Sequence, residues 1–155
     1  EEADIIVLAK STGVLEFTTG TYGQEICVDS IIKGNEWIDE NETCWIWRSY
    51  GMEVMDGQIV YRNVLNLMQD DGTYLVFLNS NQLNQYRTEK EFQTASEYFG
   101  YLPIEGAKVQ PIKENQRNVL YKEWSEIPVF ISSEKVAAAW NEIAEMLLNK
   151  FEPDA

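Results

Sequence analysis

The chain has no histidine, and this absence removes several kinds of catalytic site. Ser-His-Asp and Cys-His arrangements need an imidazole to activate the nucleophile. No dinucleotide-binding, phosphate-binding or H-E-x-x-H zinc motif is present either. A carboxylate pair could serve a glycosidase, but chance pairs are expected among 26 acidic residues. We therefore expect no enzymatic activity and no cofactor.

Cysteine and basic residues are also scarce. Two cysteines without a histidine fall short of the roughly four ligands of a zinc site, so we expect no metal. Twelve Lys and Arg residues stand against 26 Asp and Glu residues, and the formal net charge is −14. This charge repels phosphate backbones and anionic lipids, so it argues against a nucleic-acid partner and favours cationic ones.

Long apolar runs are missing as well, since none approaches the roughly 20 residues of a membrane span. The chain does not begin with Met, and a strand pattern starts within about four residues of Glu1. We interpret it as an excised domain or a mature exported protein whose targeting segment has been removed.

What the chain does contain is enough apolar sequence for one globular domain. Of its 155 residues, 45% are hydrophobic, which suits a single domain over 1–155. The densest apolar run is Thr73–Leu78, which lies between Asp71-Gly72 and Asn79-Ser80-Asn81. A short run of aromatic and β-branched residues between turn formers predicts a strand buried on both faces.

Further strands are predicted on each side of this central one. Gly13 predicts a bulge or bend within the first of them. Asp56-Gly57 predicts a tight hairpin, and 64–68 a connector under the sheet. The other strands are expected at 5–17, 26–33, 43–47, 52–55, 58–61, 97–102 and 107–112.

Two segments show helical signals. Thr88–Glu91 fits a capping box and favours one helical turn, although an irregular loop leading into the strand at 97–102 remains the alternative. Ser132 or Ser133 can cap a longer helix over about 133–151. Its apolar stripe should pack on the sheet, with the barrel strands covering about 3–130. The stripe comprises Val136, Trp140, Ile143, Ala144, Leu147 and Phe151.

Three apolar motifs carry a family resemblance over roughly 3–110. They are Ala3–Lys10, Val28–Asn35 and Gly72–Leu78. Their order resembles small exported bacterial proteins and lipoproteins, which in turn look like the OB-type barrels of the netrin and tissue-inhibitor-of-metalloproteinase (TIMP-like) superfamily. Ala9 replaces a Gly of this pattern, and Asn35 an Asp.

This resemblance implies an α+β, mainly-β fold: an OB-like antiparallel β-barrel with a C-terminal amphipathic helix packed on it. It also implies an exported location. The inhibitors approach zinc with an N-terminal cysteine, whereas this chain begins Glu1-Glu2, so the inhibitory activity is not implied with the fold.

Cys27 and Cys44 are the first candidate pair. A symmetric hairpin over 25–46 would place them opposite each other on adjacent strands, where a disulfide can form. Two small buried thiols without a bond are the alternative.

Aromatic residues form the candidate binding site. Trp37, Trp45, Trp47, Tyr50 and Tyr61 are concentrated in one third of the chain. OB barrels bind ligands on their middle strands and nearby loops, where exposed indoles can stack on a sugar or a peptide. The alternative is that these aromatics fill the barrel. Trp37, in an acidic loop, is the one we most expect to be exposed.

These observations favour a non-catalytic binding or interaction module, secreted or held on the outer face of a bacterial cell membrane. Its partner would be an unknown protein, peptide or glycan. A protease inhibitor that acts through an exposed loop at 35–42 is the second hypothesis.

Overall fold

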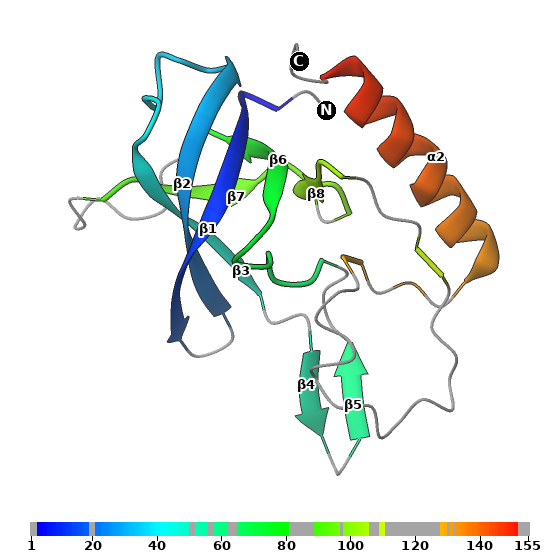
Figure 1. Ribbon diagram of the computed structural model, residues 1–155. Coiled ribbons are helices and arrows are strands. Elements are labelled where there is room, and N and C mark those ends of the chain that lie inside the picture. The colour runs from blue at the N-terminus through cyan, green and yellow to red at the C-terminus, as the bar shows by residue number, and fades with distance from the viewer. Residues whose placement is uncertain are drawn as a thin grey trace.

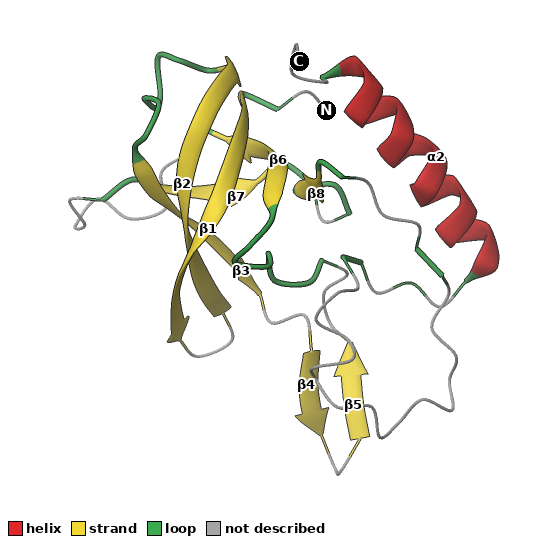
Figure 2. Ribbon diagram, in the orientation of Figure 1, coloured by secondary structure: helices red, strands yellow, loops and turns green. Residues whose placement is uncertain are grey.

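The computed structural model describes residues 3–18, 21–49, 52–55, 58–61, 65–80, 89–96, 98–105, 109–110, 128–129, 131 and 133–151. The described part is a β-barrel with one helix beside it, a mainly-β α+β fold (Figures 1 and 2). The strands are β1 (Ile5–Thr18), β2 (Thr21–Lys33), β3 (Thr43–Ser49), β4 (Met52–Met55), β5 (Gln58–Tyr61), β6 (Thr73–Asn79), β7 (Glu91–Thr94) and β8 (Tyr101–Pro103). The helix is α2 (Glu134–Lys150).

Five strands close into the barrel. The sheet order is β1-β2-β3-β7-β6-β8, and β1 also pairs with β6, which closes the ring β1-β2-β3-β7-β6; β8 pairs with β6 beside this ring. The expected OB-like barrel with a C-terminal helix is therefore confirmed, but it is mixed rather than purely antiparallel. The pair β3–β7 is parallel, whereas the other described pairs are antiparallel. An odd number of strands in a closed ring cannot alternate direction throughout, so at least one neighbouring pair must be parallel.

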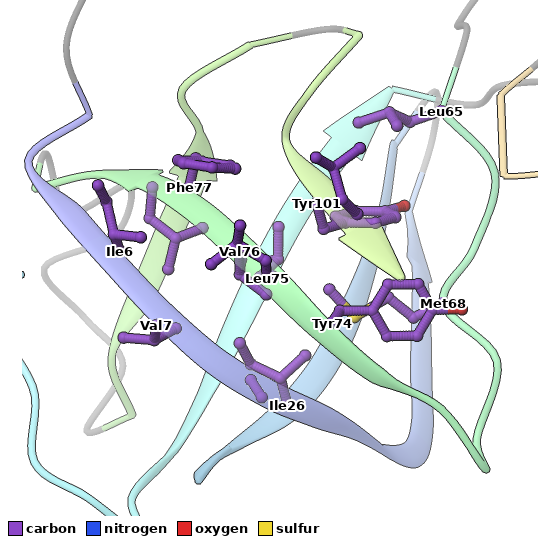
Figure 3. Packing of buried hydrophobic residues seen from close by; sticks show 14 of the residues in the cluster. Ile6, Val7, Ile26, Leu65, Met68, Tyr74, Leu75, Val76, Phe77 and Tyr101 are labelled. Atoms are coloured by element: carbon purple, nitrogen blue, oxygen red, sulfur yellow. The ribbon is translucent and has the colours of Figure 1, made fainter. Parts of the chain in front are cut away.

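The barrel interior is filled by alternate side chains of its strands. Val7 faces Val76 across β1 and β6, and Ile26 faces Cys44 across β2 and β3. Ile46 faces Phe92 across the parallel pair. All of these side chains are buried, and Figure 3 shows several of them packed together. Their burial is what holds the ring of strands closed.

The central strand β6 is buried on both faces, as its sequence predicts. Residues 74–78 are all buried. Val76 points into the barrel, whereas Phe77 points outward and meets Phe151 edge-on at 5.8 Å between ring centroids. The C-terminal end of α2 thus helps to cover the outer face of β6 (Figure 1).

Helix α2 begins and ends as its sequence predicts. The Ser133 side chain caps it by accepting a hydrogen bond from the Val136 N–H at 3.4 Å. Glu134 lies in the first turn and Lys150 in the last, where each complements the helix dipole.

The predicted stripe of α2 is confirmed at Trp140, Ala144, Leu147 and Phe151, which are buried or packed against the core, and departs from the structure at its other two positions. Trp140 is buried and stacks on Phe99 at 5.6 Å, and its Nε1–H donates to the Tyr98 carbonyl oxygen at 3.0 Å. These contacts set the rotation of the helix about its axis. As a result Val136 and Ile143, which we expected to face the sheet, are 43% and 40% exposed.

The predicted helical turn at 88–91 is wrong, because 91–94 forms strand β7. Phe92 enters the barrel, and Trp45 and Trp47 of β3 lie beside Glu91 and Gln93. Closing the barrel overrides the local capping-box signal, since only a strand can supply the parallel ladder to β3.

The predicted strand at 107–112 is not present at its described residues. Val109 and Gln110 have no regular secondary structure, and the rest of that range lies outside the described residues. The amide side chain of Asn141 instead bonds both backbone groups of Val109, at 2.8 and 3.0 Å. This segment is therefore held by α2 rather than by a neighbouring strand.

Three local predictions are confirmed. Gly13 has a positive φ of 84°, and the β1–β2 register shifts beside it, as expected for a bulge. Met55 pairs with Gln58 in the β4–β5 hairpin. Leu65 and Met68 of the connector are buried beneath the barrel (Figure 3). Among the described residues, no helix combines the length and the apolar character needed to cross a membrane.

Candidate functional site

The structure separates the five predicted aromatic residues. Trp45 and Trp47 lie on β3, and Trp37 lies in the loop between β2 and β3. Tyr61 ends β5, where only the backbone is described, and Tyr50 lies outside the described residues. The structure thus brings together two of the five, Trp45 and Trp47.

Trp45 and Trp47 stand on the outer face of the barrel because Cys44 and Ile46 point inward. Their rings stack with centroids 6.1 Å apart and planes 25° apart. We call the outward residues of β2, β3 and β7 around this stack the tryptophan face. It comprises Gly23, Glu25, Trp45, Trp47, Glu91 and Gln93.

Gly23 makes room for the Trp47 ring. The two residues are paired across β2 and β3. A Cβ atom at Gly23 would lie 2.9 Å from the indole, closer than van der Waals contact allows. Only glycine lets the ring approach the backbone of β2 so closely, so Gly23 determines where the Trp47 ring lies.

Trp45 and Trp47 differ in their exposure. Trp45 is buried, and its Nε1–H donates to Glu89 Oε2 at 2.9 Å. Its backbone N–H donates to the Lys90 carbonyl oxygen at 2.9 Å. Trp47 is half-buried. Trp45 therefore anchors the stack, and Trp47 is the more accessible of the two rings.

Carboxylates flank the stack on both sides. Trp45 lies between Glu25 of β2 and Glu91 of β7 in one row across the sheet. Glu25 is half-buried and accepts a hydrogen bond from the Thr12 hydroxyl at 2.8 Å, whereas Glu91 is buried. None of the six residues of the tryptophan face is basic, so the face is both aromatic and negatively charged.

Among the residues that the structure describes, Lys90 at the edge of this region is turned toward the β2–β3 loop. Lys90 Nζ donates to the Trp37 carbonyl oxygen at 2.9 Å and pairs with Glu42 at 3.1 Å. These contacts tie the loop to the start of β7. The Lys90 ammonium is thereby engaged with the loop.

The β2–β3 loop is held at several further points. Ile38 is buried, and the Asn41 N–H donates to the Val28 carbonyl oxygen at 2.7 Å. Glu42 Oε2 accepts from the Asp39 N–H at 2.9 Å. Trp37 stands on this framework with 41% of its surface exposed, which confirms the expectation for its exposure.

Cys27 and Cys44 are free thiols, so of the two alternatives the unbonded pair is the one found. The strands do pair, but the register is shifted by one residue: Cys27 faces Thr43, and Cys44 faces Ile26. Because side chains alternate, this shift places the two sulfurs on opposite faces of the sheet. Burial, the largest cause, raises the pKa of the Cys44 thiol to about 12.

A polar cluster at one end of the barrel interior was not predicted. Arg48 is buried, donates to the Thr94 hydroxyl at 2.6 Å and lies 6.0 Å from the centre of the Tyr101 ring. The Tyr101 hydroxyl donates to the Asn66 carbonyl oxygen, and burial raises its pKa well above the usual range. Alternation could have revealed the cluster, because Arg48 shares the inward register of Cys44 and Ile46.

This cluster fastens the connector across the open end of the barrel. The Gln69 N–H donates to the Tyr74 hydroxyl at 2.8 Å, beside the Tyr101 bond to Asn66. Its polar groups are thus engaged in closing the fold. Over the described ranges, no three His, Cys, Asp or Glu side chains are grouped so that they could hold a metal ion.

Comparison with family models, curated proteins and solved structures gives no match to this chain. The functional argument therefore depends on the tryptophan face and on the β2–β3 loop.

Proposed function

We propose that the protein is a non-catalytic binding module whose ligand, a peptide or a glycan, docks on the tryptophan face. The observation that carries the proposal is the stacked pair Trp45 and Trp47 on the outer surface of β3. The middle strands of OB barrels are where oligomeric ligands commonly bind. An indole held flat over Gly23 offers a rigid stacking surface at little entropic cost.

The test is a titration of intrinsic tryptophan fluorescence with cell-wall glycan fragments and with synthetic peptides. We expect Trp47→Leu to weaken binding at least about tenfold, which corresponds to a stacking contribution of about 1.4 kcal/mol. Trp37→Leu is the matched control, since it removes an exposed indole outside the tryptophan face. Binding that survives Trp47→Leu but not Trp37→Leu would refute the proposal.

We further propose that the protein works outside the cytoplasm, at or near a bacterial cell surface. The support is the three-motif resemblance to exported OB-type proteins, together with the OB-like barrel. The free cysteines lend this location no support, because a disulfide would have been its usual sign. The full open reading frame tests the location: a Sec signal or a lipobox upstream of Glu1 is the expected result, and an upstream cytoplasmic domain would contradict it.

A protease inhibitor acting through the loop at 35–42 is the second candidate. The observation that favours it is the anchoring of this loop by Ile38 and Lys90, which presents Trp37 on a rigid support. The backbone turns at 35–37 rather than running extended, and that geometry fits a substrate-like inhibitor less well. A panel of exported proteases decides between the two: Trp37-dependent inhibition would favour the loop over the tryptophan face.

A further inference from the structure

We propose that the ligand of the tryptophan face is cationic: a peptide segment, in extended conformation, that carries lysine or arginine side chains. This inference rests on the proposed function, because it names the chemistry that the same face selects. Three features carry it: the row of carboxylates around the stack, the orientation of Trp47 and the engagement of Lys90 with the β2–β3 loop.

The first feature is the row Glu25–Trp45–Glu91, which crosses three neighbouring strands. Adjacent strands lie about 4.8 Å apart, so each carboxylate-bearing position is about 5 Å from the tryptophan position between them. Glu89 adds a third carboxylate, whose Oε2 lies 2.9 Å from the Trp45 Nε1. A neutral ligand laid over this row would remove the half-buried Glu25 and the exposed Glu89 from water without replacing their hydrogen bonds, and that costs free energy.

The second feature is the Trp47 ring, which lies two residues along β3 from Trp45 in this row. Its inner face approaches the backbone of β2 at Gly23. Glu25 is on the same strand as Gly23, two residues on, and therefore on the same face of the sheet. A cation over the outer face of an indole gains about 0.5–2 kcal/mol from the ring quadrupole. A carboxylate within a few ångströms adds a Coulombic attraction to the same charge.

The third feature is that no cation of the face itself competes for this place. The Lys90 ammonium is engaged with the Trp37 carbonyl oxygen and with Glu42. The net charge of −14 also raises the encounter rate with cationic ligands at low salt. An extended peptide fits better than a compact amine, because alternate side chains of a strand-like ligand project on one side. They can then reach Trp47 and the carboxylate row together.

The experiment uses a fluorescently labelled peptide of alternating lysine and serine, with a glutamine-and-serine peptide and a neutral chito-oligosaccharide for comparison. Fluorescence anisotropy at physiological salt gives the three dissociation constants. We expect the lysine peptide to bind at least about tenfold more tightly than either neutral probe.

Charge-neutralised variants separate the face from the net charge. The variant Glu25→Gln with Glu89→Gln keeps the acceptors for Thr12 and Trp45 but removes two charges from the face. The control, Glu142→Gln with Glu145→Gln, removes two charges from the exposed side of α2. We expect the first pair to weaken lysine-peptide binding about tenfold and the second less than about twofold.

Two results would overturn the inference. Equal weakening by both pairs of substitutions would mean that only the net charge matters. Neutral probes that bind as tightly as the lysine peptide, and that lose binding in Trp47→Leu, would refute a cationic ligand while leaving the binding module intact. If no probe binds in a Trp47-dependent way, both proposals fail.

Discussion

A substitution at Gln24 tests most directly how the end of the barrel is closed. This buried side chain lies on β2 and bonds the connector at Met68 in both directions. Gln24 Nε2 donates to the Met68 carbonyl oxygen at 2.9 Å, and Gln24 Oε1 accepts from the Met68 N–H at 3.1 Å. A further bond from Nε2 reaches the Ser11 hydroxyl at 3.2 Å. The substitution Gln24→Leu keeps the approximate volume and removes all of these bonds.

The expected cost follows from the backbone groups left behind. A buried donor or acceptor without a partner costs about 1–3 kcal/mol, and Gln24→Leu leaves both backbone groups of Met68 in that condition. The added apolar contact of leucine offsets roughly 1 kcal/mol of this loss. The two groups together cost about 2–6 kcal/mol, so after this offset we expect the free energy of unfolding to fall by about 1–5 kcal/mol.

Urea denaturation followed by circular dichroism measures the effect. With an m-value of about 2 kcal/mol per molar urea, the midpoint should fall by about 0.5–2.5 M. The control is Gln110→Leu at an exposed position, which should change stability by less than about 0.5 kcal/mol. If both variants unfold at the same urea concentration with an unchanged m-value, the Gln24 hydrogen bonds do not hold the connector in place, and the prediction is refuted.

Three further predictions test other parts of the structure. Cys27 is half-buried, whereas Cys44 is buried and its thiol pKa is raised to about 12. Ellman's reagent at mildly alkaline pH should therefore react with Cys27 alone in the folded protein and with both thiols in denaturant. Loss of both thiols when the folded protein is oxidised would contradict the register of β2 and β3. Burial raises the pKa of Tyr101, so its hydroxyl keeps the proton to a higher pH in the folded state than in the unfolded chain. The contribution of this hydroxyl to the free energy of unfolding should be fully present below about pH 10 and should be lost as the pH rises above that value. Tyr101→Phe should remove this part of the alkaline loss of stability. Trp140→Ala should cost about 3–5 kcal/mol in urea denaturation, whereas Met146→Ala, at a position 62% exposed, should cost less than about 0.5 kcal/mol; similar costs would mean that α2 packs through another face.

Much of the fold is predictable because its signals are local. The apolar run at 73–78 is bounded by turn formers and becomes the doubly buried β6. Gly13 marks the bulge in β1 because its positive φ disfavours residues with a Cβ. Ser133 and Lys150 bound α2 through capping and dipole interactions that involve only nearby residues. None of these features depends on which strands meet.

The candidate site is less predictable because it depends on strand register. Symmetric pairing placed Cys27 opposite Cys44, and a shift of one residue put them on opposite faces. Trp45 and Trp47 share the outer face of β3, but only the packing around them buries the first and leaves the second accessible. No periodicity in the sequence separates these two roles.

By itself, the sequence determined the kind and the approximate limits of most elements and a strongly acidic net charge, because turn chemistry, side-chain alternation and formal charge are properties of neighbouring residues. Tertiary structure decided that 91–94 would be a strand, that Trp140 rather than Ile143 would face the barrel, and that Gly23 would lie beneath Trp47. The physical reason is the closure of the ring. Once β1 pairs with β6 and β3 with β7, every register is set by partners distant in the chain, and a single residue of shift exchanges the inside of the barrel for the outside.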